Sequence, residues 1–116
     1  MKISKHLTGV IGEKIALVYL WRKGYRPLDQ NIRGPRAEVD MLCIKGKALV
    51  LVEVKVRQSQ LAAHSAIHPK QLQRLQQQAL AWEGRFGATS TRLDAVLIFP
   101  HWPFIQHIRN VQGTAW

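Results

Sequence analysis

Acidic and basic residues on two neighbouring predicted strands have the types and spacing needed for metal-assisted chemistry. Residues 37–57 read as two β-strands joined by a tight turn at Gly46-Lys47. The first strand carries Asp40, and the second carries Glu53 and Lys55. Two carboxylates on adjacent strands repel each other unless a cation lies between them, and Mg²⁺ binds one or two carboxylates together with water and phosphate oxygens. The stretch therefore indicates a divalent-metal site.

The register of this hairpin decides whether the carboxylates meet. A glycine in the first central position of a two-residue turn favours type II′ geometry. The register that follows places Asp40 opposite Glu53 and Glu38 opposite Lys55, and opposed side chains project from the same face about 5 Å apart. A slip of one residue would turn the acids to opposite faces.

Net charge points to a polyanionic partner. Seventeen Lys and Arg residues against seven Asp and Glu give a formal charge of +10, which favours nucleic acid over a membrane surface. The alternative is a protein that is merely basic. Three of the seven acids, Glu38, Asp40 and Glu53, fall within residues 37–57, and this concentration favours the use of carboxylates on a metal.

Length and composition exclude several classes of protein. A chain of 116 residues is expected to form a single domain over residues 1–116. No apolar run approaches the ~20 residues of a membrane span, and the N-terminal segment lacks the pattern of a signal peptide. A lone Cys43 excludes an internal disulfide and favours the cytoplasm. The five histidines lack zinc-site spacing.

The other predicted elements flank the hairpin. Residues 8–23 predict a helix that ends at Gly24. Its apolar stripe includes Trp21, which is expected in the core. Glu13 falls within that stripe. It could form a salt bridge with a Lys or Arg, reach water from the edge of the stripe, or point over the sheet at the carboxylates. Residues 25–33 predict a strand with an irregular start, 58–68 a loop, 69–83 a helix with Trp82 in its core, and 93–99 and 104–109 strands. This order predicts an α/β sandwich around a mixed sheet.

These residues together resemble a known pattern. Glu13, Asp40 and Glu53-Val54-Lys55 match the D…(D/E)-x-K signature of the restriction-endonuclease-like (PD-(D/E)xK) nucleases, most like the archaeal Holliday-junction resolvases. More closely, the chain resembles the YraN-like family of small bacterial proteins. The segments that carry this resemblance are Gly12-Glu13-x-x-Ala16, Tyr19-Leu20, Gly24-Tyr25, Asn31-x-Arg33, Glu38-Val39-Asp40, Val52-Glu53-Val54-Lys55-x-Arg57 and Arg92-x-Asp94.

The resemblance implies an α-β-β-β-α-β core with helices flanking a mixed sheet, and phosphodiester hydrolysis assisted by Mg²⁺ or Mn²⁺. Asp40, Glu53 and the Val54 backbone carbonyl would bind the metal, with Glu13 acting directly or through water. Lys55 would contact the attacking water and the developing phosphorane charge. Asp94 is expected to be structural, in a pair with Arg92 or another basic residue. Resolvases also act as dimers, so a homodimer is possible.

Contacts to DNA are expected from basic and aromatic side chains. Arg33, Arg57, Lys70 and Arg74 are candidates for phosphate contacts, and each could equally be a solvated surface charge. Trp102 and Trp116 could stack on unpaired bases, although packing or burial against a partner is the commoner role of an aromatic side chain.

Three functions therefore compete. The first is a metal-dependent endonuclease acting on DNA, in particular branched or structured DNA. The second is a catalytically silent nucleic-acid-binding module with the same fold. The third is a protein–protein adaptor whose charge only maintains solubility, and this role leaves the placement of the carboxylates unexplained.

Overall fold

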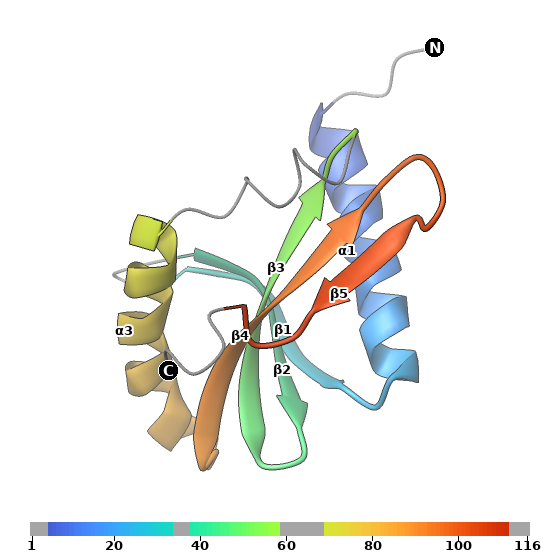
Figure 1. Cartoon of the computed structure of the whole chain (residues 1–116). Coiled ribbons are helices and arrows are strands. Elements are labelled where there is room, and N and C mark those ends of the chain that lie inside the picture. The colour runs from blue at the N-terminus through green and yellow to red at the C-terminus, as the bar shows by residue number, and fades with distance from the viewer. Residues whose placement is uncertain (1–4, 34–37, 59–68, 112–116) are drawn as a thin grey trace.

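The protein is an α/β domain in which two helices flank a five-stranded mixed sheet (Figure 1). The computed structural model describes residues 5–33, 38–58 and 69–111. The elements are α1 (Lys5–Arg22), β1 (Arg26–Arg33), β2 (Glu38–Lys45), β3 (Ala48–Val56), α3 (Pro69–Arg85), β4 (Ser90–Ile98) and β5 (Ile105–Ile108). The strands lie in sequence order, and β3 and β4 form the parallel pair. This arrangement confirms the predicted restriction-endonuclease-like α/β core.

The β2–β3 hairpin has the predicted turn, and its strands pair in the predicted register as far as Met41 and Val52. Lys45 pairs with Ala48, and Gly46 between them has φ +61°, a value that suits the first position of a type II′ turn. From there the antiparallel ladder runs to Met41 opposite Val52, where it ends. The next residues on the two strands are those predicted to bind metal.

Each helix covers one face of β3. Alternate residues Val50 and Val52 pack with Ala16 and Leu20 of α1 in one core cluster, and Val54 and Val56 extend that face. The intervening residues Leu49 and Leu51 pack instead with Leu75, Ala79 and Trp82 of α3. Because side chains alternate along a strand, Glu53 and Lys55 continue the face covered by α3.

Two glycines, Gly24 just after α1 and Gly12 within it, determine how this helix is placed. At Gly24 (φ +88°) the helix ends in a Schellman motif, in which the Tyr25 N–H donates to the Leu20 carbonyl at 3.0 Å. At Gly12 the helix approaches β3 so closely that an added Cβ would overlap the Cγ2 of Val56. The first glycine directs Tyr25 into the core, and the second brings α1 against the carboxyl end of β3.

The outer face of α1 differs from the sequence prediction. Trp21 was expected in the core, but 66% of it is exposed, whereas Trp82 is buried as predicted. Ile11, Ile15 and Val18 are exposed on the same helix. The helix is apolar on both faces, so spacing could not decide which apolar residues face the sheet.

Several sequence predictions fall on residues that the structure does not describe. They concern the loop predicted for residues 58–68, of which Gln58 alone is described, and the residues Ala37, His64, His68 and Trp116. No helix within 5–33, 38–58 or 69–111 is long and apolar enough to cross a membrane.

Candidate functional site

Asp40 lies at the point where the pairing of β2 with β3 ends. Its Oδ2 accepts a hydrogen bond of 2.8 Å from the backbone N–H of Val54. That nitrogen belongs to the peptide that joins Glu53 to Val54, so the carboxylate of Asp40 lies beside the backbone of Glu53. Just past the last backbone pair, Met41 and Val52, the Asp40 side chain thus accepts the hydrogen bond of a β3 backbone N–H.

Glu53 and Lys55 are neighbours on the same face of β3. Glu53 is 3% exposed, and its Oε2 lies 3.8 Å from the Nζ of Lys55, whose side chain is 21% exposed. A partly exposed lysine side chain therefore lies beside a buried carboxylate. The parallel partners Ala95 and Leu97 of β4 are fully buried, which supplies apolar surroundings that strengthen electrostatic interactions.

Burial raises the pKa of the Asp40 carboxyl. The hydrogen bond from Val54 and the charge of Lys55 act in the opposite direction, and Glu38 adds to the rise. A negative charge at this position is therefore poorly solvated, and a divalent cation would stabilise it. Two carboxylates beside a peptide carbonyl are hard oxygen ligands of the kind that Mg²⁺ and Mn²⁺ prefer, so the residues present fit the implied metal.

Glu13 does not complete a cluster of carboxylates. It is half-buried on α1, which packs on the face of β3 opposite to Glu53 and Lys55. Within the described parts of the chain, no group of three or more His, Cys, Asp or Glu side chains is placed to hold a metal ion. Of the other predicted metal ligands, Asp40 lies beside the Glu53-Val54-Lys55 element, through its hydrogen bond from the Val54 N–H.

Glu38 has a different neighbour from the one predicted. It pairs with Arg33 of β1 in the ladder, and the Arg33 Nε lies 3.3 Å from its Oε1. The prediction that Glu38 lies opposite Lys55 is wrong, because the β2–β3 ladder stops at Met41 and Val52 and the residues of β2 that precede Met41 are outside it. Lys55 instead lies beside Glu53.

The candidate phosphate-binding residues are spread over three elements. Arg33 is exposed at the end of β1, and Arg74 is exposed on α3. Arg57 directly follows β3, with its N–H bonded to the Ile98 carbonyl and its Nη1 donating to the Val56 carbonyl at 2.8 Å. Lys70 belongs to the first turn of α3, and its side chain is outside the described part of the structure.

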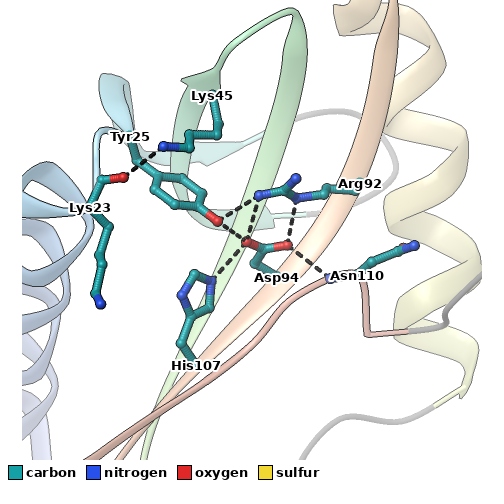
Figure 2. A network of polar contacts seen from close by, with 7 residues as sticks. All are labelled: Lys23, Tyr25, Lys45, Arg92, Asp94, His107 and Asn110. Carbon is teal, nitrogen blue, oxygen red and sulfur yellow. Dashed lines mark hydrogen bonds and ion pairs between the residues drawn. The ribbon is translucent and has the colours of Figure 1, made fainter.

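A second polar cluster is buried on the α1 side of the sheet around Asp94 (Figure 2). Its Oδ2 accepts hydrogen bonds from the Tyr25 hydroxyl at 3.0 Å and from the Nε2 of His107 at 2.8 Å. Its Oδ1 accepts from the Nε of Arg92 and from the backbone N–H of Asn110, both at 3.0 Å. Arg92 also donates to the Tyr25 hydroxyl.

These contacts determine the charge states within the cluster. Burial alone would raise the pKa of Asp94, but the hydrogen bonds from His107, Asn110 and Arg92 hold it below its usual range. Burial and the nearby carboxylate raise the pKa of Tyr25, and burial raises that of the Cys43 thiol to about 12. An ionised Asp94 with no route to solvent joins β4 to the end of α1 and to β5, which is a structural role.

The sequence predicted this cluster only in part. The pairing of Asp94 with Arg92 is confirmed, but the contributions of Tyr25 and His107 were missed. Tyr25 follows the glycine that ends α1, and this stop signal could have indicated a side chain returning to the core. His107 is 13 residues from Asp94 in the chain, and no local pattern predicts that contact.

Comparison with known proteins identifies the family. The model of uncharacterised protein family UPF0102 matches residues 12–98. A UPF0102 protein of Geobacter sulfurreducens is 37% identical over 119 residues, covering 95% of this chain and 91% of that protein. One of Methylorubrum extorquens is 37% identical, with 92% and 85% covered. Since both the family model and these relatives span most of its length, the chain belongs to the UPF0102 family, the YraN-like family that its motifs resemble.

Proposed function

We propose that this protein is a metal-dependent phosphodiester hydrolase, an endonuclease that acts on branched or otherwise structured DNA. The observation that carries the proposal is the meeting of Asp40 with the Glu53–Val54 peptide at the end of the β2–β3 ladder, with Lys55 beside it. The net charge of +10 would attract the phosphates that must approach such a site.

Each residue then has a distinct part. Asp40 and Glu53, with the Val54 carbonyl, would hold Mg²⁺ or Mn²⁺, which polarises a phosphate and lowers the pKa of a bound water. Lys55 would orient the attacking water and stabilise the charge that develops on the phosphate oxygens. Glu53 holds the amine of Lys55 in place through their 3.8 Å contact.

The test uses purified protein with labelled branched, linear duplex and single-stranded DNA, with Mg²⁺, Mn²⁺ or a chelator. The wild type is expected to cut in the presence of metal only. Asp40→Asn is expected to lose both calorimetric metal binding and cutting, whereas Lys55→Met should bind metal and fail to cut. Lys47→Met is the matched control, because Lys47 is exposed in the turn at the opposite end of β3.

Cutting that survives in Asp40→Asn would assign the activity to a contaminant or to another site. A wild type that neither binds the metals nor cuts, with DNA present, would sink the active-nuclease proposal.

The second candidate is a nucleic-acid-binding module without catalysis. The resolvase resemblance implies a third acidic residue at the metal site, Glu13. Among the described residues no group of three such side chains could hold a metal ion, which favours a module without catalysis. Metal-independent DNA binding by wild type and Asp40→Asn alike, without cutting, would support this module.

The homodimer implied by the resemblance stays a prediction. Cutting two strands of a branched molecule requires two active sites, so the proposed activity favours a dimer on DNA. Sedimentation velocity with and without a branched substrate measures the number of chains per DNA.

A further inference from the structure

The turn between β4 and β5 presents two large aromatic side chains to solvent. Trp102 is 81% exposed and Phe104 is 52% exposed. Single exposed apolar residues are ordinary on protein surfaces, so the inference depends on what holds these two rings in place and what lies beside them.

Hydrogen bonds and an unusual backbone conformation fix this turn. The Phe104 N–H donates to the His101 carbonyl at 2.8 Å, and the Phe99 N–H donates to the Phe104 carbonyl at 2.8 Å. Phe104 has φ +65°, a left-handed value that bulky side chains rarely adopt. Residues held in such conformations cluster at ligand sites, and here the conformation keeps a phenyl ring exposed.

His101 attaches the turn to the chain that leaves β3. Its ring stacks on Phe99 with centroids 5.8 Å apart, and its Nε2 lies 3.0 Å from the carbonyl oxygen of Gln58. Its Nδ1 lies 3.0 Å from the carbonyl of Trp102. Gln58 directly follows Arg57, so one imidazole joins the aromatic turn to the segment that follows the Glu53-Val54-Lys55 element.

The parallel pairing of β3 with β4 places the turn at the same end of the sheet as the proposed metal site. Lys55 pairs with Leu97 and Val56 with Ile98, and the turn begins two residues beyond Ile98. In Figure 1 the β4–β5 connection extends past the end of the sheet to which the β3 arrow points. The turn that carries the aromatic rings therefore lies at the same end of the sheet as Lys55 and Arg57.

We propose that Trp102 and Phe104 form a platform on which unpaired bases of DNA stack, next to the carboxylate site. The proposal rests on the function proposed above for the identity of the ligand, and it deepens that function by naming the feature of DNA that is recognised. Bases within a continuous duplex are stacked on one another, whereas single-stranded ends and branch points offer free base faces. Aromatic stacking tolerates any base sequence, and a basic protein attracts the adjoining phosphates.

The test measures DNA binding by fluorescence anisotropy in a chelator, so that metal and cleavage are not involved. The ligands are a labelled 12-nucleotide single strand and a blunt duplex of the same length. Trp102→Ala is expected to weaken single-strand binding roughly tenfold, in line with the loss of one stacked base, and duplex binding less than twofold. Trp102→Phe should retain most of the affinity. Trp21→Ala is the matched control, since Trp21 is exposed on α1 and away from the turn.

Phe104→Gly separates recognition from stability. Glycine adopts a positive φ without strain, so this variant is expected to unfold at a higher temperature than the wild type while binding the single strand several-fold more weakly. A purely structural Phe104 would show no loss of affinity once the variant is folded.

The outcomes distinguish the two proposals. If Trp102→Ala and Phe104→Gly bind the single strand as the wild type does, while the wild type binds and cuts DNA, the platform alone is overturned. If the wild type binds neither DNA, both proposals fail. Wild-type affinity for DNA combined with altered self-association in the variants would make the turn a protein-docking surface and would also overturn the platform.

Discussion

Two aspartates of this protein, the half-buried Asp40 and the buried Asp94, have opposite shifts of the carboxyl pKa. Asp40 has one backbone donor, and burial raises its pKa. Asp94 has donors from Tyr25, Arg92 and His107 as well as a backbone N–H, which outweigh burial and lower its pKa. The charge of Asp94 is stabilised by several hydrogen-bond donors of the protein, which fits a structural role. The charge of Asp40 has a single donor, so a bound cation would stabilise it.

At Asp40, replacement by asparagine is expected to leave the protein as stable as the wild type or more stable in metal-free buffer at pH 7. Asparagine keeps an oxygen for the Val54 N–H and removes a poorly solvated charge, so the change should be within about 1 kcal/mol in the stabilising direction. The sign follows from the raised pKa: the stability contributed by Asp40 is fully present below about pH 4 and is lost as pH rises through its folded-state pKa.

Thermal unfolding of wild type and Asp40→Asn between pH 4 and 8 checks this expectation, with Mg²⁺ or Mn²⁺ added in a second series. Metal should raise the midpoint of the wild type only. A destabilised Asn variant in chelator would show that the carboxylate stabilises the fold by itself.

At Asp94, replacement by asparagine is expected to lower the free energy of unfolding by about 2 kcal/mol at pH 7, because charge-assisted hydrogen bonds are lost in a buried position. The lowered pKa gives the opposite sign: the stabilisation is present above about pH 4 and disappears as pH falls through the folded-state pKa. The gap between wild type and variant should therefore close in acid. Denaturant unfolding at several pH values measures it, and Asp29→Asn serves as an exposed control.

At the scale of elements, α1 and the β2–β3 hairpin are fixed by different physics. The hairpin register follows from a two-residue turn and alternating burial, which are local properties. The placement of α1 depends on a single close approach, that of Gly12 to Val56. Sequence spacing predicts the helix, but the contact selects its buried face.

Gly12→Ala is therefore expected to destabilise the protein, although alanine favours a helix over glycine by about 1 kcal/mol. The new methyl would force α1 away from Val56. Gly9→Ala is the matched control on the same helix, because its methyl would meet nothing nearby, and it should stabilise by up to about 1 kcal/mol. Urea unfolding of both variants measures the difference. Val56→Ala in the Gly12→Ala background should recover part of the loss, and equal stabilisation by both glycine replacements would contradict this packing.

At the scale of the whole molecule, a net charge of +10 predicts that DNA affinity falls steeply with salt. Each phosphate contact contributes about −0.9 to the slope of log affinity against log salt for duplex DNA. Arg74 lies in the N-terminal half of α3, the half nearer in sequence to β3, and Arg85 is the last residue of the helix.

Arg74→Gln is expected to reduce the slope by about 1, whereas Arg85→Gln should leave it unchanged. Anisotropy titrations of one duplex at a series of salt concentrations measure both slopes. Equal effects of the two variants would mean that charge acts only as a diffuse field.

The fold and part of the candidate site were predictable for physical reasons that are local in the chain. The turn at Gly46-Lys47 fixed the pairing of β2 with β3 from Lys45 and Ala48 as far as Met41 and Val52. Counting along the two strands therefore placed Asp40 near the Glu53-Val54-Lys55 element, where its carboxylate accepts from the Val54 N–H. The prediction for Glu38 failed because the β2–β3 ladder stops at Met41 and Val52. Alternation of apolar and polar residues does not show where the pairing of two strands stops.

Local features of the chain were enough to predict the order of the elements, the hairpin and the pairing of Arg92 with Asp94, since turn chemistry, periodicity and short spacing act between near neighbours. The buried face of α1 was settled only in the folded domain, where Trp21 is left exposed. Tertiary structure also brought His107 to Asp94. These outcomes depend on contacts between distant segments, where several apolar or polar residues could satisfy the local pattern equally and only three-dimensional packing selects one.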